Sequence, residues 1–272
     1  MAGTVALVAP IVREVDIDGG VAGNYDELPV WSAPFGLMIL ERVPVRRGQV
    51  VVDVGAGTGF LTVELAQRAA AGRVVAVDPW AEAMDVLRRK VEYLGLNNVE
   101  LVVGDADRLE LPDESVDVVV SNLGINNFDN AAAVLRECHR VLRPGGRLLI
   151  STNLVGHMQE FYDAFADVLA RLGRDRQALD EHINHRATID GTRAMLETAG
   201  FVTEVETGSF RMRFADGTAL LNHYFIRLGF LDDWRAVAGA EVLTAVEAEL
   251  NRRGEVTLTI PAACFEGIRA RS

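Results

Sequence analysis

Apolar positions recur with two different periods through the middle of the chain. Runs rich in valine are typical of buried strands, and between them apolar residues follow the spacing of helices that pack on a sheet. The strand-like runs end at Asp53, Asp78, Val103, Ser121 and Thr152, and helical patterns cover residues 58–70, 80–94 and 129–142. This order of elements predicts a parallel, doubly wound α/β sheet.

Three regions exceed what such a sheet needs. We expect an N-terminal cap segment over residues 1–45 and a main domain over residues 46–272, with insertions at about 153–187 and 215–253. Each insertion follows a predicted strand, and the ligands of open α/β sheets bind outside the carboxyl ends of the strands. The insertions should therefore lie over the active site.

Composition narrows the classes of partner. The chain has 272 residues and a formal net charge of −12, which opposes binding to the phosphate backbone of nucleic acids. Its two cysteines, Cys138 and Cys264, favour a reducing compartment, with the cytoplasm as the default. We expect no charged leader and no membrane helix. These features predict a cytoplasmic protein with a small-molecule partner, no nucleic-acid partner and no membrane partner, and they leave a homodimer possible.

The segment from Val50 to Phe60 joins the first strand to the first helix and carries one acid and three glycines. Glycine can adopt φ > 0 and lets a ligand approach the backbone, while the unpaired N–H groups at a helix start favour an anionic group. The G-x-G-x-x-G pattern of dinucleotide-binding dehydrogenases would need glycine at position 60. Because Phe60 stands there, an NAD-dependent oxidoreductase is disfavoured.

The pattern Asp53-x-Gly55-x-Gly57-x-Gly59 resembles motif I of the class I S-adenosylmethionine-dependent methyltransferases. Residues 109–117 resemble the family's L-P-F-x-D-x-S-F-D segment, and residues 140–146 (R-V-L-R-P-G-G) resemble the R-V-L-K-P-G-G turn of quinone-biosynthesis C-methyltransferases. The resemblance covers about residues 50–152. It implies a Rossmann-like sheet of seven mainly parallel strands, helical insertions over the active site, S-adenosylmethionine as cofactor, and methyl transfer to a small molecule.

The same resemblance implies where the cofactor binds. Asp78 would hold the ribose through its carboxylate oxygens, Pro79 and Trp80 would border the adenine, and Asp105 with Ala106 would recognise the adenine edge. An alternative role for Asp78 is to cap the following helix. The cofactor-binding candidates are Tyr25, Asp53, Gly55, Ala56, Gly57, Gly59, Asp78, Pro79, Trp80, Asp105, Ala106 and Asn122.

The loop that follows Ser121 should border both the cofactor and the methyl acceptor. It lacks the N-P-P-Y sequence of amino-group methylases, which weakens a reading as an adenine, cytosine or glutamine methylase. Asn126 is a candidate for orienting the acceptor, although it can equally be a turn residue. His157 and His223 are candidate general bases near neutral pH. No metal site is expected, because the pair His182 and His185 lacks a clear third ligand.

Alternative functions stay open at this point. A non-catalytic domain that binds S-adenosylmethionine or another nucleoside would carry the same glycine turn, since such turns record binding rather than catalysis. A protein methyltransferase would also fit, with an acidic surface suited to a basic target. For an enzyme, in-line alignment of the acceptor with the activated methyl group would supply most of the rate gain.

Overall fold

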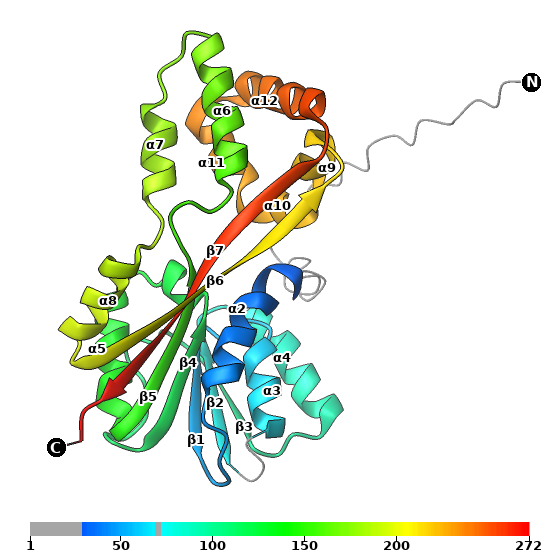
Figure 1. Ribbon diagram of the computed structural model, residues 1–272. Coiled ribbons are helices and arrows are strands. Elements are labelled where there is room, and N and C mark those ends of the chain that lie inside the picture. The colour runs from blue at the N-terminus through cyan, green and yellow to red at the C-terminus, as the bar shows by residue number, and fades with distance from the viewer. Residues whose placement is uncertain (1–28, 69–71, 272) are drawn as a thin grey trace, which may run out of the picture.

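The computed structural model describes residues 29–68 and 72–271, and for residues 29 and 30 only the backbone. Its centre is a seven-stranded sheet in the order β3-β2-β1-β4-β5-β7-β6 (Figure 1). Five strands are parallel, and β7 runs antiparallel to both neighbours. The strands are β1 (Val50–Val54), β2 (Arg73–Asp78), β3 (Val99–Val103), β4 (Val116–Asn122), β5 (Leu142–Asn153), β6 (Phe201–Phe214) and β7 (Val256–Arg269). The predicted fold class is confirmed.

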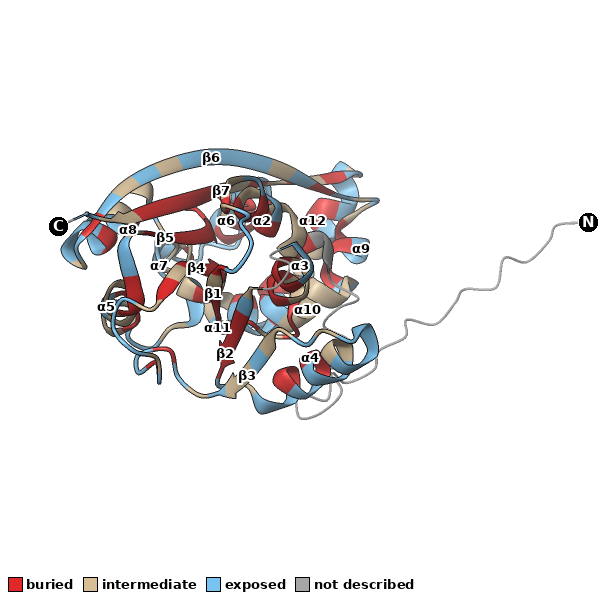
Figure 2. Cartoon of the chain, turned by 90° about the horizontal axis from the view of Figure 1, so that it is seen from below, coloured by how far each residue is buried: buried red, intermediate tan, exposed pale blue. Residues whose placement is uncertain are grey.

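Helices cover both faces of the sheet, and the valine runs explain why (Figures 1 and 2). Along each strand alternate side chains point to opposite faces, so every second valine packs against a different set of helices. Val51, Val74 and Val118 pack with α2 (Pro29–Arg42) and α3 (Phe60–Arg68), whereas Val52, Val75 and Val119 pack with α5 (Ala131–Val141) and α8 (Ile189–Thr198). Helix α4 (Ala81–Leu94) packs beside α3, where its Leu87 is fully buried.

A helical cap with a core of its own stands above the sheet. It comprises α6 (Gln159–Arg171), α7 (Gln177–Asn184), α9 (Gly217–Asn222), α10 (Tyr224–Gly229), α11 (Leu231–Ala238) and α12 (Ala240–Arg253). The long strands β6 and β7 run from the sheet up into the cap (Figure 1). Phe161 and Trp234 stack within the cap at a centroid distance of 4.0 Å. Both predicted insertions are therefore largely helical.

Several local expectations need correction. The helix predicted over residues 129–142 begins at Ala131, after the N-cap Asn130, whose side chain accepts the N–H of Ala133. The R-P-G-G turn lies inside β5, where the pairing with β4 shifts from Leu142 to Arg147, so these residues form a bulge and not a separate turn. Strand β7 was not located from the sequence, although its V-T-L-T-I segment alternates with the strand period.

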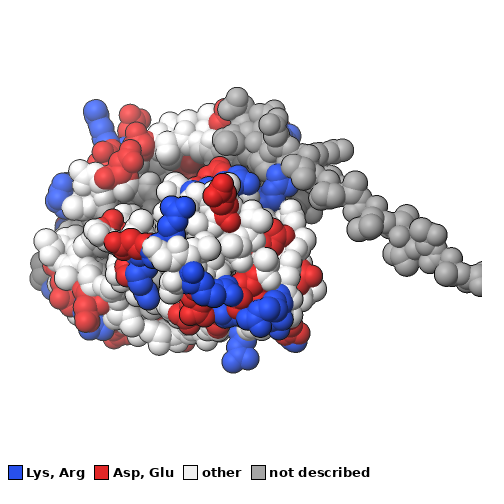
Figure 3. All heavy atoms as spheres, turned by 90° about the horizontal axis from the view of Figure 1, so that it is seen from above, with Lys and Arg blue, Asp and Glu red and all other residues white. Residues whose placement is uncertain are grey.

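The face of the protein formed by the cap carries side chains of both charges. Seen from above, acidic and basic side chains are interspersed over the cap face in Figure 3. In the part of the chain that the structure describes, no helix is both long and apolar enough to cross a bilayer.

Candidate active site

A cavity of about 410 Å³ lies at the carboxyl ends of β1, β2 and β4. This is the edge at which open α/β sheets bind their ligands. Most of the predicted cofactor-binding residues line it: Asp53, Gly55, Ala56, Gly57, Asp78, Pro79, Trp80 and Asn122. The topology therefore brings together segments that are up to 70 residues apart in sequence.

Glycines shape the turn between β1 and α3. Gly55 has φ of +74° and donates its N–H to the carbonyl oxygen of Val77 at 2.9 Å; an added Cβ would lie 3.3 Å from the backbone of Gly124. Gly59 has φ of +90°, and an added Cβ would collide with the buried side chain of Leu87. Gly59 consequently serves helix packing and does not line the cavity, which differs from its expected contact with the cofactor.

The carboxylate of Asp78 closes the turn from the opposite side. One oxygen accepts the N–H of Gly57 at 2.8 Å and the other accepts the N–H of Trp80 at 2.8 Å. Trp80 is the N-cap residue of α4, so Asp78 serves the start of that helix as well as the cavity. Each carboxylate oxygen can accept a second hydrogen bond. The two expected roles of Asp78 are thus compatible in geometry.

Asp53 is the buried acid at the bottom of the cavity. Its carboxylate accepts the Thr62 hydroxyl at 2.6 Å. Burial raises the pKa of Asp53 to about 7; the Thr62 hydrogen bond opposes this rise, and the negative charge of Asp78 adds to it. A cationic group bound nearby would favour the ionised form of Asp53, since opposite charges lower the pKa of a carboxyl group.

Some cofactor-binding candidates lie elsewhere. Tyr25 falls outside the described residues. Asp105 is exposed and lines a neighbouring cavity of about 400 Å³ with Val77, while the buried Ala106 lines neither cavity. The N–H of Gly104 donates to the Asp78 carbonyl oxygen at 3.1 Å, which keeps the segment at the same edge of the sheet. We call the cavity of about 410 Å³ the cofactor cavity, as the candidate binding site of the cofactor. Asp105 is therefore near the cofactor cavity but does not line it.

Sequence reasoning missed other residues that line the cavity: Ser32, Thr58, Phe60, Leu61, Leu123, Gly124, Asn127 and Phe128. Those next to the glycine turn could have been found by adjacency. Ser32 could not, because it comes from α2, far away in sequence; its carbonyl oxygen accepts the Asn122 amide at 3.2 Å. Leu123 has φ of +63°, a strained backbone that is typical of functional sites.

Of the candidate catalytic side chains, Asn126 and His157 are linked through Asn153, whereas His223 lies apart from them. Asn126 belongs to the short helix η2 (Gly124–Asn127); its oxygen accepts the Thr152 hydroxyl at 2.6 Å and its amide donates to Asn153 at 3.0 Å. His157 is buried, with Nδ1 at 3.4 Å from the Asn153 amide nitrogen. His223 begins α10 in the cap and packs edge-on against Phe214. Neither histidine lines the cofactor cavity.

Electrostatics weaken both histidines as bases. Burial, together with the charges of Arg186 and His182, lowers the pKa of His157 to about 3. Burial also lowers the pKa of His223. At neutral pH both imidazole rings are uncharged. Because their pKa values are lowered, the unprotonated nitrogen of each ring is a weak base. Within the described ranges, no three side chains of His, Cys, Asp or Glu are grouped as they would be around a metal ion.

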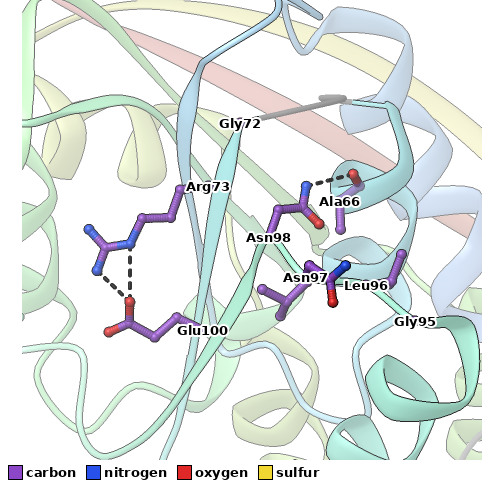
Figure 4. Close-up of a pocket in the computed structure, with 9 residues that line it drawn as sticks. Ala66, Gly72, Arg73, Gly95, Leu96, Asn97, Asn98 and Glu100 are labelled. Carbon is purple, nitrogen blue, oxygen red and sulfur yellow. Dashed lines mark hydrogen bonds and ion pairs between the residues drawn. The ribbon is translucent and has the colours of Figure 1, made fainter.

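Another cavity, of about 670 Å³, lies at the opposite edge of the sheet, where β2 and β3 begin (Figure 4). It is bordered by the exposed ion pair of Arg73 and Glu100 and by Asn98, whose amide donates to the Ala66 carbonyl oxygen at 2.9 Å. Because parallel strands present their amino ends there, this cavity is not placed for the chemistry of such folds.

Comparison with known proteins agrees with this site. A family model described as a methyltransferase domain matches residues 52–150. The ubiquinone/menaquinone biosynthesis C-methyltransferase UbiE of Escherichia fergusonii is 34% identical over 170 residues, which are 58% of this chain and 68% of that protein. The corresponding enzyme of Enterobacter sp. is 33% identical over 169 residues, covering 57% of this chain and 67% of that protein.

Solved structures share the fold at low identity. YcgJ from Bacillus subtilis superposes with a TM-score of 0.64 at 18% identity, covering 88% of this chain and all of that one. A putative methyltransferase from Bacillus halodurans gives 0.61 at 22%, covering 86% and 98%. Phosphoethanolamine N-methyltransferase 2 of Haemonchus contortus, solved with S-adenosylmethionine, gives 0.55 at 18%, covering 87% and 52%.

Fold, glycine turn and paired acids define a class I S-adenosylmethionine-dependent methyltransferase. The chain belongs to that class and is related to the UbiE C-methyltransferases; it is an enzyme whose cofactor is S-adenosylmethionine. The residues present suit this cofactor, because Gly57 faces open space in the cavity and the carboxyl groups of Asp53 and Asp78 line it as possible hydrogen-bond acceptors. An NAD-dependent function is not favoured.

Proposed function

We propose that the enzyme methylates a small, partly apolar molecule bound between the cofactor cavity and the helical cap. The observation that carries this proposal is the position of Leu123. Its side chain lines the cofactor cavity and also packs against the apolar core of the cap. An acceptor above Leu123 would therefore meet the cofactor on one side and the cap on the other.

The surroundings support an acceptor with apolar surface. Rings from α2, β6 and the cap belong to the same apolar cluster as Leu123: Trp31, Phe35, Phe210, Phe225 and Phe230. Trp31 and Phe225 stack at 4.5 Å between centroids. Aromatic walls with a few fixed polar groups are typical of small-molecule sites. They also exclude water, which strengthens the electrostatic interactions inside the site.

When bound, S-adenosylmethionine supplies a methyl group already activated by a sulfonium. The residues of the chain then have to orient the acceptor, and orientation alone can lower a barrier by about 7–11 kcal/mol in the best cases. Asn122 is suited to this task because its amide is fixed at both ends, to Ser32 and to the Ser151 hydroxyl. Asn126 is fixed in the same way by Thr152 and Asn153.

His157 and His223 stay proposals as general bases. Because their pKa values are lowered, they are weak bases, so the acceptor should lose its proton with little assistance from either histidine. The names of the curated relatives describe C-methyltransferases of ubiquinone and menaquinone biosynthesis, so carbon is the first acceptor atom to test. Methylation of protein and binding without turnover are the alternatives, and no contact in the described residues favours either.

The test is to incubate the protein with methyl-labelled S-adenosylmethionine and a cell extract, then to follow label into small molecules, protein and nucleic acid. We expect label in small molecules only, and much less of it with the Asp78→Ala variant at the same cofactor concentration. Label in protein or nucleic acid would overturn the proposed acceptor class. Absence of label from every fraction, with S-adenosylhomocysteine still bound, would favour a binding domain without turnover.

A further inference from the structure

Helix η2 separates the cofactor cavity from a second cavity of about 530 Å³. Leu123, Gly124 and Asn127 line the first cavity, whereas Ile125 and Asn126 line the second. The other walls of the second cavity come from the segment before α8 and from α8 itself, with Arg186, Thr188, Thr192 and Met195. The two cavities thus share a wall that is one short helix thick.

Arg186 places a positive charge at the wall of this second cavity. No carboxylate of the described residues lies within ion-pair distance of its guanidinium, whereas its neighbours in the cap, Arg171 and Arg176, are paired with Glu249 and Asp180. The Nε atom of Arg186 is buried and has no hydrogen-bond partner. A buried donor without an acceptor is costly and rare in native proteins, so it calls for a ligand.

The polar side chains around Arg186 include the Tyr162 hydroxyl, which is hydrogen-bonded to it, and the carboxylate of Asp233 acts electrostatically on Tyr162. Its guanidinium carbon lies 5.7 Å from the ring centre of Phe230, and the ring of His157 lies 5.8 Å from the same ring. Because Asn153 donates toward Nδ1 of His157, the proton of that neutral ring belongs on Nε2, and this atom too is buried without a partner. Two orphaned donors therefore flank Phe230.

Apolar walls limit the charge that the cavity can accept. Ile125, Ala187 and Met195 border it, and Arg186 is the one residue with a permanent positive charge among those that line it. One guanidinium matches the single charge of a carboxylate, which it can bind through two parallel hydrogen bonds. A phosphate dianion would leave one charge unbalanced in partly apolar surroundings.

We propose that Arg186 binds a carboxylate of the methyl acceptor, on the far side of η2 from the cofactor. The acceptor is then an apolar molecule with a single acidic group remote from the methylated atom. This inference rests on the proposed function and specifies its substrate class. In it Arg186 is a binding residue, and Asn126 is the residue that fixes the wall between the acid and the methyl donor.

The first experiment classifies the labelled product of the extract assay by charge. A monocarboxylate is retained by a strong anion exchanger at about pH 7 and released at about pH 2, because a carboxyl group titrates near pH 4. Product that passes through unretained at about pH 7 would overturn the inference while leaving the proposed function intact. Product still retained at about pH 2 would overturn it as well, in favour of a phosphate or sulfate. If the wild-type protein labels no small molecule at all, the proposed function itself fails.

The second experiment uses Arg186→Gln and Arg186→Lys, with Arg174→Gln as a control that removes an exposed arginine of the cap outside both cavities. For Arg186→Gln, the extract concentration that gives half-maximal labelling should rise at least about tenfold, since hydrogen bonds to a charged group contribute about 1.5–3 kcal/mol. Arg186→Lys should recover part of this loss. Affinity for S-adenosylhomocysteine should not change.

Thermal unfolding of the ligand-free protein separates binding from structure. Removing a half-buried charge that forms no salt bridge and leaves Nε without an acceptor should leave the melting temperature of Arg186→Gln equal to or above that of the wild type. A lower melting temperature in both Arg186 variants would assign the residue a structural role and overturn the inference. Unchanged half-saturation in Arg186→Gln would overturn it too.

Discussion

The carboxylate of Asp78 and the backbone N–H of Gly57 are joined by a 2.8 Å hydrogen bond across the cofactor cavity. This bond ties the end of β2 to the turn after β1, and the second oxygen of the same carboxylate holds the N–H of Trp80. One side chain therefore sets the spacing between two loops that are separated by a helix in sequence. The cofactor-binding edge of the sheet is organised around it.

Replacing Asp78 by Ala should weaken S-adenosylhomocysteine binding by about tenfold to a hundredfold, because hydrogen bonds to a charged carboxylate contribute about 1.5–3 kcal/mol. Isothermal titration calorimetry measures the change. Asp85→Ala is the matched control, since Asp85 is an exposed acid on α4 that pairs with Arg88 and lines no described cavity. An affinity that is equal in Asp78→Ala and the wild type would remove Asp78 from the site.

Replacing Gly57 or Gly59 by alanine should lower the stability of the protein by different amounts. Gly59→Ala should lower the free energy of unfolding by at least about 2 kcal/mol, because a left-handed backbone and a collision with Leu87 act together. Gly57→Ala meets no atom within 4 Å, so strain alone should cost about 1 kcal/mol. Urea unfolding compares the two.

The same pair of variants also separates packing from binding. The new methyl group of Gly57→Ala stands in the cofactor cavity and should impair S-adenosylhomocysteine binding more than stability. Gly59→Ala should do the reverse. A Gly57→Ala protein that binds as tightly as the wild type would mean that the cofactor does not approach this part of the turn.

Stability should depend on pH through Asp53. Burial raises the pKa of its carboxyl from the usual 3.8 to about 7 in the folded protein, so between these values the unfolded chain ionises while the folded chain keeps its proton. The free energy of unfolding should therefore fall as pH rises from about 4 to about 7 and level off above that. Asp53→Asn, which keeps an acceptor for Thr62, should lack this decline.

Cofactor binding should respond to the same group with the opposite sign. The ammonium of S-adenosylhomocysteine favours an ionised Asp53, so affinity should increase from about pH 6 to about pH 7.5. Calorimetry over this range, with Asp53→Asn as the comparison, tests it. A wild-type affinity that stays flat while the variant behaves identically would place the ammonium away from Asp53.

The cap should be acid-sensitive at Glu249. This buried carboxylate is held by Arg171, Arg252 and Arg253. Hydrogen bonds from Arg252 and then Arg253 lower the pKa of Glu249 to about 2, so its contribution to stability is complete above about pH 4.5 and is lost as pH falls toward 2.

Glu249→Gln should accordingly lower the melting temperature at neutral pH, and the difference from the wild type should shrink in acid. Glu241→Gln on the same helix is the control, because Glu241 is exposed and begins α12. Differential scanning calorimetry at several pH values decides the matter. Equal melting temperatures for both variants at neutral pH would show that the ion pairs of Glu249 with the arginines add nothing to the stability of the protein.

Much of the core fold could be predicted from local patterns. The boundaries of β1, β2 and β4 follow the valine runs within a residue or two, because strands buried on both faces need continuous apolar sequence. The order of acids and glycines predicted which strand ends come together, and a cavity lies there, since parallel strands place their carboxyl ends along one edge. These features depend on residues close together in sequence.

The tertiary structure alone decided what approaches that edge from a distance. Ser32 of α2 accepts a hydrogen bond from Asn122, which lies 90 residues away in sequence. Arg186 lines the same cavity as Asn126, although α6 and α7 separate the two residues in sequence. The pKa values of Asp53 and His157 were likewise set by burial, which no spacing records. Sequence fixes local geometry because backbone preferences are local, whereas burial and charge depend on every segment that packs nearby.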